Sequence, residues 1–137
     1  MGHWGVRSYE NDAANDALDA GFDRVHGAAY EELMDDHNPL TPEQIQQKLA
    51  APETLAAAVG AFEESAGRPA EEWDEVARLG FAGVVVRHAE LGVPAPGPWR
   101  DRAVAYLIDE PIDWDEATAR KLRRQKEIEL LQGPDRA

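Results

Sequence analysis

Residues 73–88, WDEVARLGFAGVVVRH, decide which fold to expect for this chain. Apolar residues recur here at spacings of three and four, and the positions between them are largely apolar as well. A helix that is apolar on all sides must be surrounded by other elements, so this stretch predicts a central, buried helix that opens at Pro69 and carries Trp73 on its stripe. Gly80 and Gly83 would let a neighbouring helix approach it closely. His88 lies on the same stripe, a position typical of a hydrogen-bonded core residue rather than a ligand or base.

Helix start and stop signals divide the rest of the chain, whereas alternating strand patterns are scarce. Asn11 or Asp12 is a favourable N-cap for a first helix, whose apolar stripe continues to about Asp36 although Gly21 and Gly27 weaken it. Residues 41–44, Thr-Pro-Glu-Gln, have the order of a cap, a proline at the first helical position and a capping-box glutamine. The remaining boundaries are marked by proline, glycine or an acidic cap: Pro52, Gly67, Pro98, Pro111, Asp113 and Gly133.

These boundaries predict an all-α fold, a single compact bundle of five or six helices over residues 1–137. Residues 1–11 are expected to form a docked N-terminal segment, and residues 134–137 a disordered tail. The docking expectation rests on Trp4, because an indole near a chain end stays ordered only when its large ring is buried. Glu10 could accept hydrogen bonds from backbone amides or from the Trp4 ring.

The same opening residues carry a recognisable motif. Met1-Gly2-x-Trp4-Gly5 is followed by Tyr9-Glu10-Asn11-Asp12-x-Ala14-x-Asp16. This order resembles the start of an uncharacterised bacterial family, domain of unknown function 4259, whose members open with Met-Gly-x-Trp-Gly, an aromatic residue, Asp or Glu, and then Asn-Asp-x-Ala-x-Asp. The resemblance covers about the first 20 residues. It implies that these residues serve a shared domain, and it implies no activity, substrate or cofactor.

Composition narrows the classes of function. The chain has 27 acidic residues against 14 Lys and Arg, a formal net charge of −13, which a nucleic-acid backbone would repel. It has no cysteine, so disulfides and thiolate metal sites are excluded and a reducing compartment is expected. With no secretory leader or membrane-spanning apolar run, we expect a cytoplasmic protein that binds no membrane. Zinc-protease, dinucleotide and phosphate-loop motifs are missing, so no cofactor is predicted and a non-enzymatic role is favoured.

Four aspartates follow one side of the first expected helix. Asp12, Asp16, Asp19 and Asp23 are spaced by four, three and four residues, and like charges at this spacing repel each other. They therefore indicate a face for a divalent cation or for a basic partner, unless they are simply solvated near the helix start. His26 continues the line and could pair with Asp23, but no nucleophile accompanies such a dyad.

Residues 120–126, RKLRRQK, form a basic run on the last expected helix. Such a run could bind phosphate, but in so acidic a chain it favours pairing with the protein's own carboxylates or plain solvation. Neighbouring Glu116, Glu127 and Glu129 are suited to such ion pairs.

The sequence thus predicts a small helical domain that acts through protein–protein binding, in an accessory, inhibitory or immunity-type role, with a basic protein as partner. The alternative is a metal-dependent or small-ligand-binding protein that uses the acidic side of the first helix. The candidate binding residues are those of the opening motif and of that helix: Trp4, Glu10, Asn11, Asp12, Asp16, Asp19, Asp23 and His26.

Overall fold

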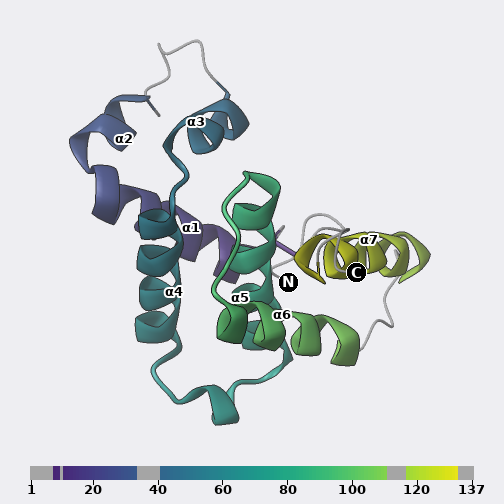
Figure 1. The fold of residues 1–137 in the computed structure, drawn as a ribbon. Helices are drawn as coiled ribbons and strands as arrows, with labels where there is room; N and C mark the ends of the chain where they lie inside the picture. Colours follow the sequence, from purple (N-terminus) through teal and green to yellow (C-terminus); the bar gives the residue numbers. More distant parts are fainter. Residues whose placement is uncertain (1–7, 10, 34–40, 111–116, 133–137) are drawn as a thin grey trace.

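The computed structural model describes residues 8–9, 11–33, 41–110 and 117–132, and these form seven α-helices and no strand (Figure 1). The all-α prediction is therefore confirmed, although the helix count exceeds the expected five or six. In chain order the elements are α1 (Asp12–His26), α2 (Ala28–Leu33), α3 (Pro42–Leu49), α4 (Pro52–Ala66), the 3-10 helix η1 (Ala70–Glu72), α5 (Glu75–Glu90), α6 (Gly97–Asp109) and α7 (Ala117–Gln132).

The additional helix arises because the first expected helix is broken at Gly27. This glycine has φ 53° and ψ −118°, a conformation that ends α1, so the prediction of one helix continuing to about Asp36 is wrong. The turn brings Tyr30 of α2 back over Phe22 of α1, with ring centroids 5.7 Å apart. The Tyr30 hydroxyl donates to Asp19 Oδ1 at 2.6 Å. Packing between the two helices therefore favours the break, which sequence periodicity does not reveal.

Several predicted helix caps are confirmed. Asn11 Oδ1 accepts a hydrogen bond from the Ala14 amide at 2.9 Å, which makes Asn11 the N-cap of α1. Thr41 and Gln44 form the reciprocal capping box of α3, and Pro52 opens α4. Gly67 ends α4 with φ 69°. The boundaries expected at Pro111, Asp113 and Gly133 lie outside the described residues.

The start of the central helix differs from the prediction. Pro69 is followed by η1, and α5 begins only after Asp74, whose side chain accepts a hydrogen bond from the Ala77 amide at 2.9 Å. The expectation that Trp73 lies on the helix is therefore wrong, because the Asp74 cap leaves Trp73 in extended backbone just before it. The Trp73 ring is nevertheless buried, and its Nε1 donates to the Arg68 carbonyl oxygen at 3.0 Å.

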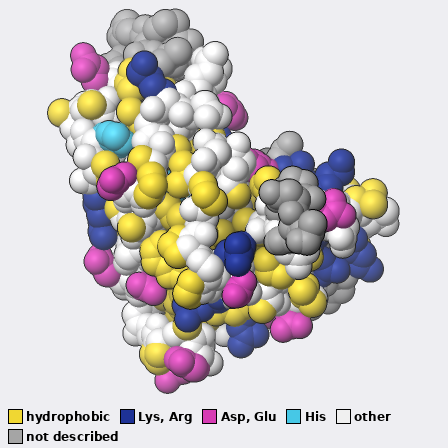
Figure 2. Space-filling view, viewed as in Figure 1, with side chains coloured by type: hydrophobic (Ala, Val, Ile, Leu, Met, Phe, Trp, Pro, Cys, Tyr) yellow, Lys and Arg dark blue, Asp and Glu magenta, His cyan; other side chains and the backbone are white. Residues whose placement is uncertain are grey.

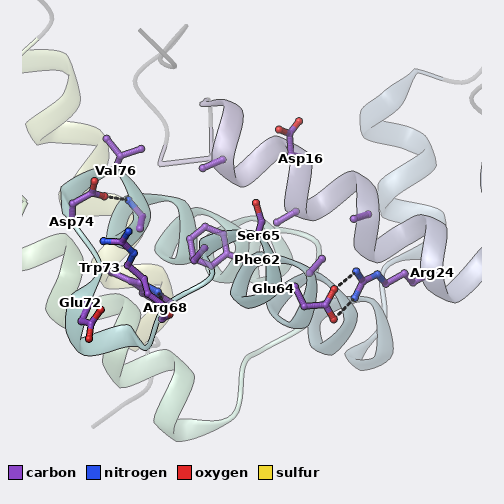
Figure 3. A pocket seen from close by; sticks show the side chains of 16 residues that line it. Asp16, Arg24, Phe62, Glu64, Ser65, Arg68, Glu72, Trp73, Asp74 and Val76 are labelled. Atoms are coloured by element: carbon purple, nitrogen blue, oxygen red, sulfur yellow. Dashed lines mark hydrogen bonds and ion pairs between the residues drawn. The ribbon is translucent and has the colours of Figure 1, made fainter.

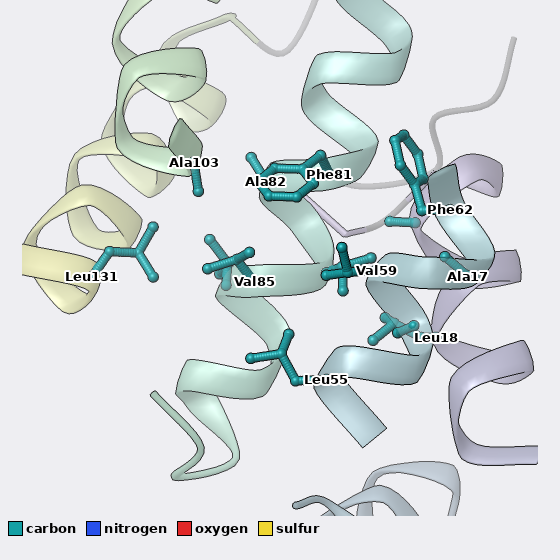
Figure 4. Packing of buried hydrophobic residues seen from close by; sticks show 14 of the residues in the cluster. Ala17, Leu18, Leu55, Val59, Phe62, Phe81, Ala82, Val85, Ala103 and Leu131 are labelled. Atoms are coloured by element: carbon teal, nitrogen blue, oxygen red, sulfur yellow. The ribbon is translucent and has the colours of Figure 1, made fainter. Parts of the chain in front are cut away.

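Helix α5 forms the centre of the molecule, as its apolar sequence predicts. Phe81, Val84, Val85 and Val86 are fully buried, and α5 contacts α1, α4, α6 and α7. Val85 lies between side chains of α4 on one side and of α6 and α7 on the other (Figure 4). None of the helices in the described part of the chain has both the length and the apolar character needed to cross a bilayer.

Two glycines of α5 permit close approaches. A side chain at Gly80 would meet Phe62 of α4 and Ala13 of α1, so neighbouring helices do approach there. At Gly83 the close neighbour is not a helix: a Cβ atom would lie 2.5 Å from the backbone oxygen of Ser8. The segment that precedes α1 therefore crosses the central helix at a point where only glycine fits.

Candidate functional site

The four aspartates of α1 form an exposed face. Asp12, Asp16, Asp19 and Asp23, called the acidic face below, are all exposed, and none of them forms an ion pair with a Lys or Arg among the described residues. Asp19 accepts the Tyr30 hydroxyl, and burial together with this carboxylate raises the pKa of Tyr30. The described residues contain no cluster of three or more His, Cys, Asp or Glu that could hold a metal ion. The carboxylates are thus spread along the helix instead of converging on one point.

The other predicted site residues divide between structural positions and undescribed ones. His26 Nε2 donates to the Leu49 carbonyl oxygen at 3.0 Å, which ties the end of α1 to the end of α3 and commits this ring nitrogen. Asn11 is buried, and its Nδ2 donates to the Ser8 carbonyl oxygen at 2.6 Å in addition to its cap bond. Trp4 and Glu10 lie outside the described residues.

The segment just before α1 is held by residues that the sequence does not indicate for this role. The Ser8 amide donates to Glu127 Oε2 at 2.8 Å, across 119 positions of sequence. The Tyr9 hydroxyl donates to Glu90 Oε1 at 2.6 Å, and the Arg87 guanidinium lies 5.3 Å from the centre of the Tyr9 ring. No local pattern marks these carboxylates as partners of the N-terminal segment, because the contacts depend entirely on tertiary packing.

The basic run of α7 pairs with the protein's own acids, as its context predicts. Arg120 is buried and binds Glu110 at 2.7 Å and Glu127 at 3.0 Å, and Arg123 binds Glu90 of α5. Burial raises the pKa of Glu127, although Arg120 and the Ser8 amide oppose that rise. The basic side chains that remain exposed include Lys121 and Lys126, and Figure 2 shows Lys and Arg gathered over α7.

A groove opens beside the acidic face, between α1, α4 and the start of α5 (Figure 3). It encloses about 600 Å³, and Asp16 belongs both to its rim and to the acidic face. Its floor and walls are mainly alanine, with the edges of two aromatic rings, and its rim is charged. The lining residues are Ala13, Asp16, Ala17, Ala20, Arg24, Ala61, Phe62, Glu64, Ser65, Ala66, Arg68, Glu72, Trp73, Asp74, Val76 and Ala77.

Small side chains explain why this groove is left open. Ala13, Ala17 and Ala20 follow one side of α1 at spacings of four and three, and they are too short to fill the space that faces Ala61 and Phe62 of α4. At one end, Arg24 of α1 reaches across to Glu64 of α4, with a closest distance of 2.7 Å (Figure 3). This alanine spacing was the only sign in the sequence of a surface that α4 does not cover.

The chain was compared with protein-family models, with curated proteins and with solved structures, and no match was found in any of the three comparisons. The resemblance of the opening residues to domain of unknown function 4259 therefore stays a prediction.

Proposed function

We propose that this protein acts by binding another protein, in an accessory or inhibitory role, and that the partner presents basic residues to the acidic face of α1. The observation that supports the proposal most is that all four carboxylates are exposed and share no ion pair with the described cations. Like charges at helical spacing cost a few tenths of a kcal/mol per pair. A basic partner would remove this repulsion on binding, and the field of the four charges would accelerate its association.

In the first step of the test, a partner is captured from lysate of the source cells at low salt, and that partner is then purified. Its affinity is measured by calorimetry for the natural chain and for the triple variant Asp16→Asn, Asp19→Asn, Asp23→Asn. We expect the triple variant to bind at least about tenfold more weakly, because each lost charge removes part of the attraction. The affinity of the natural chain should also fall as salt rises from 50 to 300 mM, since exposed charges are screened.

A matched control separates this face from net charge in general. Glu43, Glu75 and Glu129 are exposed acids on other helices, and their triple change to Gln removes the same charge. The control variant should bind like the natural chain. Equal loss in both triple variants, or no loss in either, would show that the acidic face is not the binding surface.

The same carboxylates have an alternative use as a cation site. A hard cation such as Ca²⁺ takes about six to eight oxygen ligands, which normally come from more than one segment. The spread of the aspartates along α1 favours the protein partner over this alternative. A cation site would raise the melting temperature in millimolar Ca²⁺, Mg²⁺ or Mn²⁺ or micromolar Zn²⁺, and Asp16→Asn with Asp23→Asn would abolish the rise.

A further inference from the structure

The groove beside the acidic face has the chemistry of a specificity pocket for that partner. We propose that it takes a short segment of the basic partner in which an apolar side chain stands between Lys or Arg residues. The apolar side chain would enter over Phe62 and Trp73, and the flanking cations would reach Asp16 and Glu72 on the two walls (Figure 3). This inference rests on the proposed function, and it adds which part of the partner is recognised.

The groove floor is preformed. Phe62 and Trp73 are 5% and 3% exposed, and their rings meet edge to face with centroids 5.2 Å apart. Phe62 also packs on the backbone of α5 at Gly80, where an added Cβ atom would lie 2.8 Å from Phe62 Cε1. A ring held on both sides cannot turn away to close the groove. An apolar group that enters therefore meets a surface that needs no reordering, which favours binding.

One wall of the groove carries Val76, an apolar side chain that is mostly exposed to solvent. Val76 lies in the first turn of α5 and is 63% exposed, although most apolar residues of α5 are buried. Alanine methyl groups from α1 and α4 continue this apolar lining. A side chain of the size of Leu or Phe would cover Val76 and the alanines together, which a purely charged partner would leave in water.

The charges on the rim select a basic segment. Glu64 is engaged by Arg24, and Asp74 caps α5, so both carboxylates already have internal partners. Asp16 and Glu72 form no ion pair within the described part of the chain, and Arg68 is the remaining cation of the lining. The six charged lining residues are four acids and two arginines, which leaves the groove net negative. An acidic segment would be repelled, and a neutral one would leave two carboxylates partly desolvated without compensation.

The probe for this inference is a displayed library of random 12-residue peptides, selected on the natural chain at 50 mM salt. We expect enriched peptides to carry an aliphatic or aromatic residue with at least two Lys or Arg within three positions of it. Synthetic copies should bind the variant Ser65→Trp at least about tenfold more weakly, because Ser65 is an exposed groove residue and the indole fills the space. They should bind Ala105→Trp, a matched change on the exposed side of α6, as they bind the natural chain.

The outcomes distinguish this inference from the proposed function. One outcome would contradict the groove proposal and still support binding at the acidic face. In that outcome the enriched peptides are basic but have no apolar position. They bind Ser65→Trp as they bind the natural chain, and they bind the Asp16, Asp19, Asp23 triple variant more weakly. Apolar peptides that bind without basic residues would overturn the charge selection, because the groove would then be a pocket for neutral ligands. Both proposals fail if two results are found together. The first is that no selected peptide binds the natural chain more tightly than it binds Ser65→Trp. The second is that the isolated partner binds the triple variant as tightly as it binds the natural chain.

Discussion

Helices α1 and α7 both carry runs of like charge, but they differ in whether those charges are paired inside the protein. The arginines of α7 turn inward, where Arg120 and Arg123 bind carboxylates supplied by α5, α6 and α7 itself. The aspartates of α1 turn outward, and no described cation pairs with them. A run of charge therefore points to an external partner only when the fold provides no internal one. By this criterion the paired arginines of α7 are structural, and the aspartates of α1 remain available to a partner.

The largest expected effect comes from breaking the internal pairing of α7. Arg120→Ala leaves Glu127 buried with only the more distant Arg123 Nε, at 4.0 Å, as a cationic neighbour, and it also releases Glu110 at the end of α6. Removing one partner of a buried ion pair costs about 3–5 kcal/mol, so we expect the free energy of unfolding to fall by that amount. Urea denaturation followed by circular dichroism measures it. A loss below about 1 kcal/mol would place α7 with α1 as a solvated helix and remove the contrast.

The buried side chain of His88 adds a pH dependence of stability to this comparison. His88 is fully buried against Phe22, and burial lowers its pKa from 6.5 to about 4. Between these two pH values His88 takes up a proton in the unfolded chain but not in the folded chain. The free energy of unfolding therefore falls as the pH drops from 6.5 to about 4, and His88 causes no further loss below that pH. The contribution is on the order of 3 kcal/mol.

Carboxylic acids in general protonate near the lower end of this range, so the contribution of His88 must be obtained as a difference. His88→Gln removes the titrating ring and keeps a hydrogen-bonding group near Thr54 Oγ1, which lies 2.9 Å from His88 Nε2. Unfolding free energies of both chains at pH 7 and pH 4.5 give the comparison. We expect the variant to lose less stability than the natural chain over this interval, and parallel losses would contradict the assignment.

The smallest expected effect tests the acidic face directly. Asp23 lies near the C-terminal end of α1, where the helix dipole disfavours a negative charge, and Asp19 stands four residues before it. Asp23→Asn should therefore stabilise the fold by about 0.3–0.5 kcal/mol at low salt, and the gain should shrink in 1 M salt. Thermal unfolding at the two salt concentrations measures this difference. Destabilisation by Asp23→Asn would reveal a favourable internal contact of this carboxylate.

The elements that could be predicted from sequence are those set by neighbouring residues. The capping box at Thr41 and Gln44 and the cap at Asn11 depend on residues within three positions of each other, so they are visible in the chain. The break at Gly27 is different, because Gly21 lies inside the same helix without breaking it. Which glycine ends α1 is decided by the packing of Tyr30 on Phe22, and no local pattern encodes that contact.

The candidate site divides in the same way. The spacing of the four aspartates is sufficient by itself to place them on one side of α1. The groove could not be placed, because it depends on how α1, α4 and the turn at Trp73 sit against one another. Trp73 itself was expected inside the central helix, and its true position before Asp74 is what gives the groove one of its aromatic edges.

The hydrogen bond between the Ser8 amide and Glu127 has a consequence for synthesis of the protein. These residues are 119 positions apart, so a nascent chain emerging from the ribosome carries Ser8 long before its acceptor exists. The backbone of Ser8 can rest against Gly83 once α5 has formed, but it gains its carboxylate only when α7 has been translated. Contacts of such long range form late, since the intervening chain must first be ordered. Helix α7 thus fastens a segment that precedes α1, so this contact cannot form until α7 has been translated.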